Sequence, residues 1–135
     1  MAYIWSKDLE TGNKLIDQQH QQLIQSINDL LDACSQGKGR DKIVETMQFL
    51  QSYTAKHFAD EETLQQRSNY PDYMNHKRYH DTFKKTVADI LAELKTSGPS
   101  VALVAKVNTS VASWFLSHIK REDTKVAKHI NSVSQ

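Results

Sequence analysis

The chain has 135 residues, and its 17 Lys and Arg against 16 Asp and Glu give a formal net charge of +1 at pH 7. A charge this balanced produces no field that would attract nucleic acid or an anionic membrane, so the sequence predicts neither as a partner. The length suits a single domain, residues 1–135, and the lone Cys34, with neither a signal peptide nor a membrane-length apolar run, predicts a cytoplasmic protein.

Short breaks that contain Gly or Pro divide the chain into an N-terminal arm, residues 1–15, and four long periodic segments. The breaks are GKGR at 37–40, RSNYP at 67–71 and TSGPS at 96–100. The helices expected from them span about 16–35, 41–66, 71–95 and 100–130. Because short loops make consecutive helices run antiparallel, the sequence predicts an all-α, antiparallel up-down-up-down four-helix bundle.

Apolar residues recur every three or four positions in each expected helix, which is the spacing of a helix that buries one face. Metal-binding residue types occupy some of these inward positions. In chain order the inward residues are Ile16, His20, Leu23, Ile24, Ile27, Leu30, Leu31 and Cys34; Ile43, Met47, Leu50, Thr54, His57, Glu61 and Leu64; Tyr73, His76, His80, Phe83, Val87, Ile90 and Leu94; and Val104, Val107, Val111, Trp114 and His118. Every expected helix thus contributes at least one imidazole to the interior.

Five of the six histidines fall on inward faces, although a helix buries only about three positions in seven, so chance would give this about once in seventy. A buried imidazole without a partner costs about 1–3 kcal/mol, and a shared metal site removes that cost. His76 and His80, like His57 and Glu61, lie four residues apart, so each pair can hold one ion. Five imidazoles suit iron, copper, nickel or zinc and exceed the needs of one tetrahedral zinc, which favours two carboxylate-bridged ions.

Four short motifs resemble those of the hemerythrins, specifically the bacterial hemerythrin domains. They are IDQQH at 16–20, HFADEE at 57–62, HKRYH at 76–80 and HIKRED at 118–123, and the resemblance extends from Trp5 to about Val126. It implies an antiparallel four-helix bundle with a non-haem diiron centre that binds dioxygen reversibly.

The resemblance also implies a ligand for each position of that centre. One iron would be held by His76, His80 and His118, and the other by His20 and His57. Glu61 and Asp123 would bridge two iron ions, Fe2+ or Fe3+, together with an oxo or hydroxo group. The iron with fewer ligands would keep one position open for dioxygen.

The resemblance and the helical spacing disagree about the last carboxylate. From His118, the residue four positions on is Glu122, about 40° around the helix, whereas Asp123 is about 140° away. Spacing alone therefore favours Glu122. The resemblance favours Asp123, which requires a local widening such as a π-helical turn.

Several residues beside the expected ligands are candidates for lining an oxygen pocket: Gln65, Ile119, Phe58 and Trp114. Gln65 stands where the family usually has a large apolar residue. Its amide can point inward and bind a bound ligand or water, or Leu64 can fill the pocket while Gln65 faces solvent. Ordinary core packing is the alternative for the other three. His129 is expected at the surface.

Three functions are compatible with this sequence. The first is reversible dioxygen binding for storage, transport or delivery by a monomeric, free-standing protein that begins at Met1. The second is an oxygen- or redox-sensing domain of a larger receptor, whose metal site would look the same. The third is a diiron enzyme that acts on peroxide or nitric oxide; five imidazoles count against it, and Gln65 keeps it open.

Overall fold

The computed structural model describes residues 3–133, nearly all of them helical. The elements are a short 3-10 turn η1 (Lys7–Leu9), three long helices α1 (Lys14–Ser35), α2 (Gly39–Arg67) and α3 (Tyr73–Ser97), and a fourth rod. That rod consists of α4 (Val101–Lys106), η2 (Val107–Ala112), α5 (Ser113–His118), η3 (Ile119–Asp123) and α6 (Thr124–Val133), of which η2 and η3 are π-helical.

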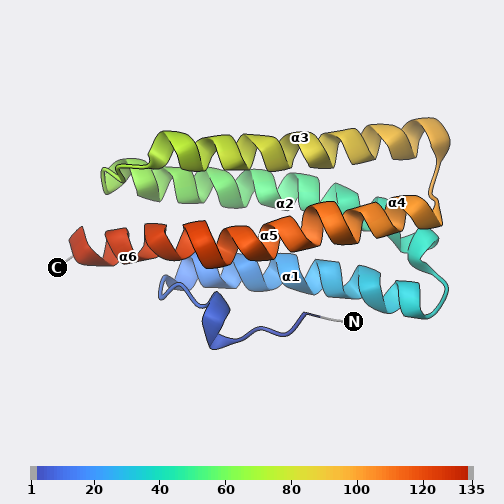
Figure 1. Ribbon diagram of the computed structural model, residues 1–135, viewed down its shortest axis with the longest axis horizontal. Coiled ribbons are helices and arrows are strands. Elements are labelled where there is room, and N and C mark those ends of the chain that lie inside the picture. The colour runs from blue at the N-terminus through green and yellow to red at the C-terminus, as the bar shows by residue number, and fades with distance from the viewer. Residues whose placement is uncertain (1–2, 134–135) are drawn as a thin grey trace.

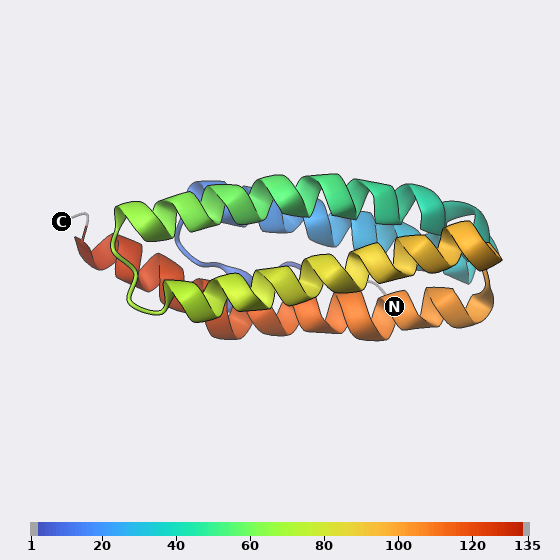
Figure 2. The same cartoon turned by 90° about the horizontal axis from the view of Figure 1, so that it is seen from above.

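The four rods run alternately in opposite directions and pack side by side (Figures 1 and 2). Short loops at 36–38, 68–72 and 98–100 join them. The all-α four-helix bundle predicted from the sequence is therefore confirmed. The bounds differ by a few residues, because α2 begins at Gly39, α3 begins only at Tyr73 after a turn at Pro71, and the last rod extends to Val133.

Local side-chain chemistry sets where the helices begin and end. The side chains of Asn13 and Ser100 accept hydrogen bonds from the backbone N–H groups of Ile16 and Leu103, both at 3.0 Å, and so cap α1 and α4. Gly98 ends α3 with a φ of 76°, a left-handed conformation that glycine adopts at little cost. These caps fix the register of the rods that carry the inward histidines.

The interior has an apolar half and a polar half. Near the loops at 36–38 and 98–100 the buried side chains are aliphatic, among them Ile27, Leu30, Ile43, Met47, Ile90, Leu94 and Leu103. Toward the loop at 68–72, the buried side chains include His20, His57, Glu61, Gln65, His76, His80, His118 and Asp123. Burial of so many polar groups at one end of the bundle requires that they satisfy one another or a bound ion.

The fourth rod departs from the predicted inward face. Leu103 and Phe115 are buried, whereas Val104 and Trp114 are only half-buried. A π-helical segment holds one more residue than the α-helical turn that it replaces, so η2 moves the inward position that follows it from 114 to 115. The prediction for Trp114 as a core residue was wrong for this reason.

Two smaller expectations were also wrong. Leu64 is half-buried and Gln65 is fully buried. The next inward residue of α2 after Glu61 is therefore four positions on, not three. Cys34 is half-buried against the core, not fully inside it.

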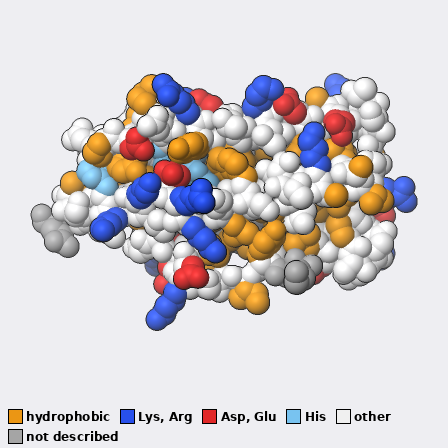
Figure 3. All heavy atoms as spheres, viewed as in Figure 1, with side chains coloured by type: hydrophobic (Ala, Val, Ile, Leu, Met, Phe, Trp, Pro, Cys, Tyr) orange, Lys and Arg blue, Asp and Glu red, His pale blue; other side chains and the backbone are white. Residues whose placement is uncertain are grey.

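The described part of the N-terminal arm, residues 3–13, lies along α1 (Figure 1). Tyr3 and Trp5 pack against the core, and the backbone of Tyr3 exchanges two hydrogen bonds of 2.7 and 2.8 Å with the side chain of Asn28. Across residues 3–133, every helix is too short or too polar to cross a lipid bilayer. Charged side chains of both signs are spread over the face of the molecule drawn in Figure 3.

Candidate metal centre

Seven buried side chains from all four rods meet in two overlapping groups of potential metal ligands. One group comprises Glu61, His76, His80, His118 and Asp123, and the other comprises His20, His57, Glu61 and Asp123. Within each group, one ligand atom per residue lies within 4.8 Å of all the others. These are the seven residues that the sequence analysis singled out as metal ligands, and the structure brings all of them together.

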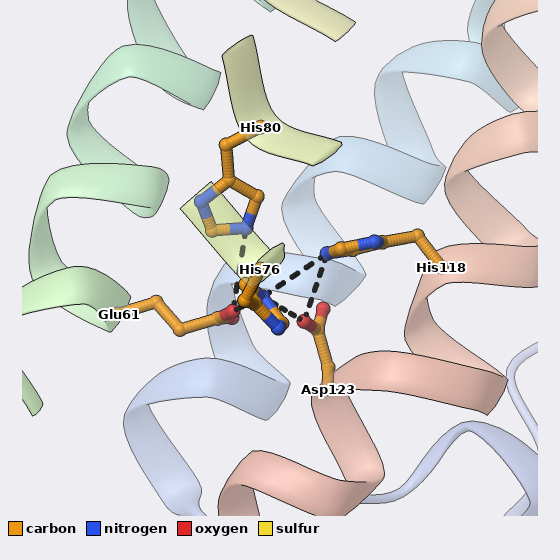
Figure 4. A group of neighbouring side chains, drawn as sticks. All are labelled: Glu61, His76, His80, His118 and Asp123. Carbon is orange, nitrogen blue, oxygen red and sulfur yellow. Dashed lines mark hydrogen bonds and ion pairs between the residues drawn. The ribbon is translucent and has the colours of Figure 1, made fainter. Parts of the chain in front are cut away.

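In the first group, three imidazole rings and two carboxylates point toward one another (Figure 4). His76 Nε2 lies 2.5 Å from Glu61 Oε1 and 3.1 Å from Asp123 Oδ1. His118 Nε2 lies 3.1 Å from Asp123 Oδ1, and His80 Nε2 lies 3.4 Å from Glu61 Oε1. Three ring nitrogens and one oxygen of each carboxylate therefore face a common point.

The second group uses the other oxygen of each carboxylate. His20 Nε2 lies 2.8 Å from Asp123 Oδ2, and His57 Nε2 lies 3.5 Å from Glu61 Oε2. Glu61 and Asp123 thus each present one oxygen to either group. A carboxylate arranged in this way is placed to bridge two cations.

The π-helical segment η3 accounts for the position of Asp123. Its carboxylate is fully buried among the rings, whereas the Glu122 side chain is 15% exposed and lies 3.9 Å from Lys125 Nζ. The local widening that Asp123 requires is present at Ile119–Asp123. Geometry therefore brings Asp123, and not Glu122, to the two groups.

The chemistry of the buried atoms fits metal ions. Within residues 3–133, His20 Nε2, His57 Nε2, His80 Nε2, Glu61 Oε2 and both Asp123 oxygens face the centre without completing a hydrogen bond. An unsatisfied buried polar atom costs about 1–3 kcal/mol, and more when it is charged. A cation that enters a protein exchanges its water ligands for the lone pairs of imidazole nitrogens and carboxylate oxygens. One or more bound ions would therefore satisfy these buried atoms together.

The side chains around the site favour ionised carboxylates. Burial acts against their charge, yet interaction with His118, His20 and His76 holds the pKa of Asp123 well below its usual value, and His76 and His80 lower that of Glu61. Burial likewise acts against a charged His76, but Asp123 and Glu61 raise its pKa to about 10. Burial lowers the pKa of His57 to about 4, so that ring is neutral at pH 7 and its lone pair is available.

Comparison with known proteins agrees with this geometry. The family model described as the hemerythrin HHE cation-binding domain matches residues 11–130, which is most of the chain. The chain belongs to the hemerythrin family. This confirms the family expected from the sequence and supports oxygen binding at a non-haem iron site.

Individual hemerythrins cover nearly the full chain. A bacteriohemerythrin of Pseudomonas aeruginosa is 34% identical over 120 residues, which is 89% of this chain and 76% of that protein. A myohemerythrin of Sipunculus nudus is 30% identical, over 91% of this chain and 89% of its own length. A solved structure of a hemerythrin leucine-to-tyrosine mutant is 26% identical with a TM-score of 0.80, covering 96% of this chain and 98% of that one.

Three of the residues expected around an oxygen pocket differ in burial: Phe58 and Ile119 lie in the core, and Trp114 lies at the surface. Phe58 is fully buried and stacks on His80, with ring centroids 3.8 Å apart, and Ile119 is also fully buried. Trp114 stacks on the outer face of His118 at 4.7 Å and lines a surface pocket of about 280 Å³. Phe115, which the sequence analysis did not single out, lies edge-on to His20 at 5.6 Å.

Gln65 points inward, which decides between the two alternatives left open for it. The side chain is fully buried, and its Nε2 donates to Glu61 Oε1 at 3.3 Å. Its Oε1 is buried and accepts no hydrogen bond among the described residues. The hemerythrin interior therefore carries an unused acceptor one helical turn beyond Glu61.

Two further polar residues, Gln19 and Glu62, contact histidines from behind, and Asp60 contacts Gln19 in turn; the sequence analysis missed all three. Gln19 Oε1 lies 2.7 Å from His57 Nδ1, and Gln19 Nε2 donates to Asp60 at 2.8 Å. Glu62 Oε2 lies 3.0 Å from His80 Nδ1. Each is next in sequence to an expected ligand, but adjacency alone does not say which helix a side chain faces. His129 lies apart from both groups, half-buried, with Nε2 2.7 Å from the Ser68 carbonyl oxygen.

Proposed function

We propose that this protein binds dioxygen reversibly at a diiron centre bridged by Glu61 and Asp123. The observation that carries the proposal is the orientation of the two carboxylates. Each carboxylate points one oxygen toward one group of histidines and its other oxygen toward the other group. A single-ion site would need no such orientation.

This orientation of the carboxylates assigns the remaining ligands to two iron subsites. His76, His80 and His118 would complete the first, which we call the three-histidine subsite. His20 and His57 would complete the second, the two-histidine subsite. Iron bound there, bridged also by an oxo or hydroxo group, would supply the electrons for reversible oxygen binding, and the two-histidine subsite has one protein ligand fewer.

Three buried phenylalanine side chains shield this region from water on the inner side of the bundle. Phe58, Phe83 and Phe115 are all at most 2% exposed, and Phe58 and Phe115 contact ligand rings directly. An apolar enclosure admits a small neutral molecule while it restricts water and protons. Restricted proton access supports release of the bound molecule rather than its chemical conversion.

The ligand set also favours binding over oxygen activation. Ferritin-like diiron proteins use about four carboxylates and two histidines. Here five imidazoles and two carboxylates meet, so the site carries less negative charge to stabilise high oxidation states. Storage, transport or delivery of oxygen is therefore the function that the site supports best.

One observation favours a second candidate, an enzyme acting on peroxide or nitric oxide. The free Oε1 of buried Gln65 can accept a hydrogen bond from a protonated ligand or from water. A water held by this acceptor would supply the proton that turnover requires. Assays of peroxide and nitric oxide consumption by the iron-loaded protein test this candidate directly.

The primary test is iron loading followed by exposure to air. We expect two iron atoms per chain and a visible charge-transfer spectrum that appears with oxygen and disappears when oxygen is removed. One iron per chain would contradict the bridged centre. Two irons with a spectrum that does not reverse would contradict reversible binding.

A further inference from the structure

One ring in each group of histidines is supported from behind, and the two supporting residues differ in charge. His80 of the three-histidine subsite contacts the carboxylate of Glu62, at 3.0 Å from Nδ1. His57 of the two-histidine subsite contacts the neutral amide of Gln19, at 2.7 Å from Nδ1. Behind His57, a carboxylate is reached only through the Gln19 amide, because Asp60 accepts a hydrogen bond from Gln19 Nε2 at 2.8 Å.

Both contacts select the same tautomer of the ring. A carboxylate accepts but does not donate, so His80 must carry its proton on Nδ1 and turn the lone pair of Nε2 toward the centre. The bond from Gln19 Nε2 to Asp60 fixes the amide with Oε1 toward His57, which likewise places the proton on Nδ1. Both rings are thereby oriented to bind a metal through Nε2.

The two contacts differ in how strongly they raise the basicity of the ring. A carboxylate stabilises the partial positive charge that an imidazole acquires on binding a cation, and an amide does so less. Phe58 distinguishes the two rings in orientation, because it stacks on His80 at 3.8 Å and 7° and holds the plane of that ring. It lies only tilted and 5.6 Å from His57.

We propose that Glu62 and the Gln19–Asp60 pair are positioning residues that give the two metal subsites unequal affinities, so that the three-histidine subsite fills first. The larger ligand group, with three rings against two, acts in the same direction. This inference rests on the two-metal centre proposed above and extends it to the order of metal loading.

The test is a titration of the metal-free 135-residue chain with Co2+ under argon, followed by calorimetry and by visible absorption. The wild-type protein should bind two ions in separate steps, at least about tenfold apart in affinity. Glu62→Gln keeps a hydrogen-bond acceptor but removes the charge, and it should weaken the first step about tenfold or more while the second stays within about twofold.

A reciprocal variant tests the same idea in the opposite direction. Gln19→Glu combined with Asp60→Asn preserves the total charge and moves the carboxylate directly behind His57. It should strengthen the second step about tenfold and narrow the gap between the steps. Glu93→Gln, which removes an equal charge from an exposed position on α3, is the matched control and should leave both steps within about twofold.

The proposal is overturned if Glu62→Gln changes neither step, or weakens both equally, relative to Glu93→Gln. Should Glu62→Gln fail to fold, an unchanged second step in the charge-moving double variant overturns it as well. Two wild-type steps of equal affinity would contradict the loading order but leave the bridged centre intact. Binding of only one Co2+ per chain would instead contradict the two-metal centre itself.

Discussion

Asp123 Oδ1 lies 3.1 Å from His118 Nε2, although the two residues are five positions apart on one continuous rod. In a regular α-helix their side chains would point about 140° apart. The π-helical segment η3 between them brings both to the same side. A backbone irregularity of five residues thus decides which carboxylate reaches the histidines.

The choice of carboxylate can be tested by two alanine variants. Asp123→Ala removes an oxygen from both subsites, and we expect it to bind less than one iron per chain. Glu122→Ala removes a partly exposed side chain beside Lys125 and should retain two irons. Iron counts measured by a chelator assay would contradict the assignment if Asp123→Ala stayed fully loaded.

Gln65 is expected to limit the lifetime of the oxygenated protein. Gln65→Leu removes the hydrogen bond to Glu61 and the free Oε1, so water and protons lose a polar contact next to the centre. The oxygenated spectrum should therefore decay several-fold more slowly. Gln66→Leu changes the exposed neighbouring amide and serves as the control. Equal decay rates in the two variants would exclude Gln65 from this role.

Iron removal should destabilise the fold, because the proposed centre links side chains from all four rods. A ligand at 100 times its dissociation constant stabilises the native state by about 2.7 kcal/mol. For a domain of this size that corresponds to a fall in Tm of roughly 10 °C. Circular dichroism melts with and without chelator measure the shift, which should vanish in His76→Ala/His80→Ala.

The corrected face of the fourth rod predicts unequal costs for two adjacent aromatic residues. Phe115 is 1% exposed and lies against His20, so Phe115→Ala should cost about 3–5 kcal/mol in the free energy of unfolding. Half-buried Trp114 leaves a smaller cavity, and Trp114→Ala should cost less than half as much. Urea denaturation of the two metal-free variants measures both free energies of unfolding. A larger loss for Trp114→Ala than for Phe115→Ala would contradict the inward face that η2 gives the fourth rod.

The sequence predicted the bundle because the features that specify it are local. Inward histidines at helical spacing, Gly or Pro at each break and short loops sufficed for four antiparallel rods. Spacing of four residues paired His57 with Glu61 and His76 with His80, because i and i+4 side chains share a face of a helix. The full set of seven came from the resemblance of four motifs to the hemerythrins, which favoured Asp123 where spacing alone favoured Glu122. Their role as ligands stays a prediction until metal is measured.

The parts that the sequence did not predict depend on the backbone or on neighbouring helices. A regular period of 3.6 residues cannot anticipate η2, so it placed Trp114 inside in place of Phe115. The contacts of Gln19 with Asp60 and of Glu62 with His80 join different helices. Such contacts depend on how the rods are rotated against each other, which the pattern along one helix does not record.

The sharing of Glu61 and Asp123 between the two groups has a consequence for engineering a mononuclear protein. Neither carboxylate can be removed from one subsite without also removing it from the other. Each histidine belongs to one group only, and His20 and His57 are the histidines of the proposed two-histidine subsite. Replacing those two histidines is therefore the route to a one-iron variant that keeps three imidazoles and both carboxylates.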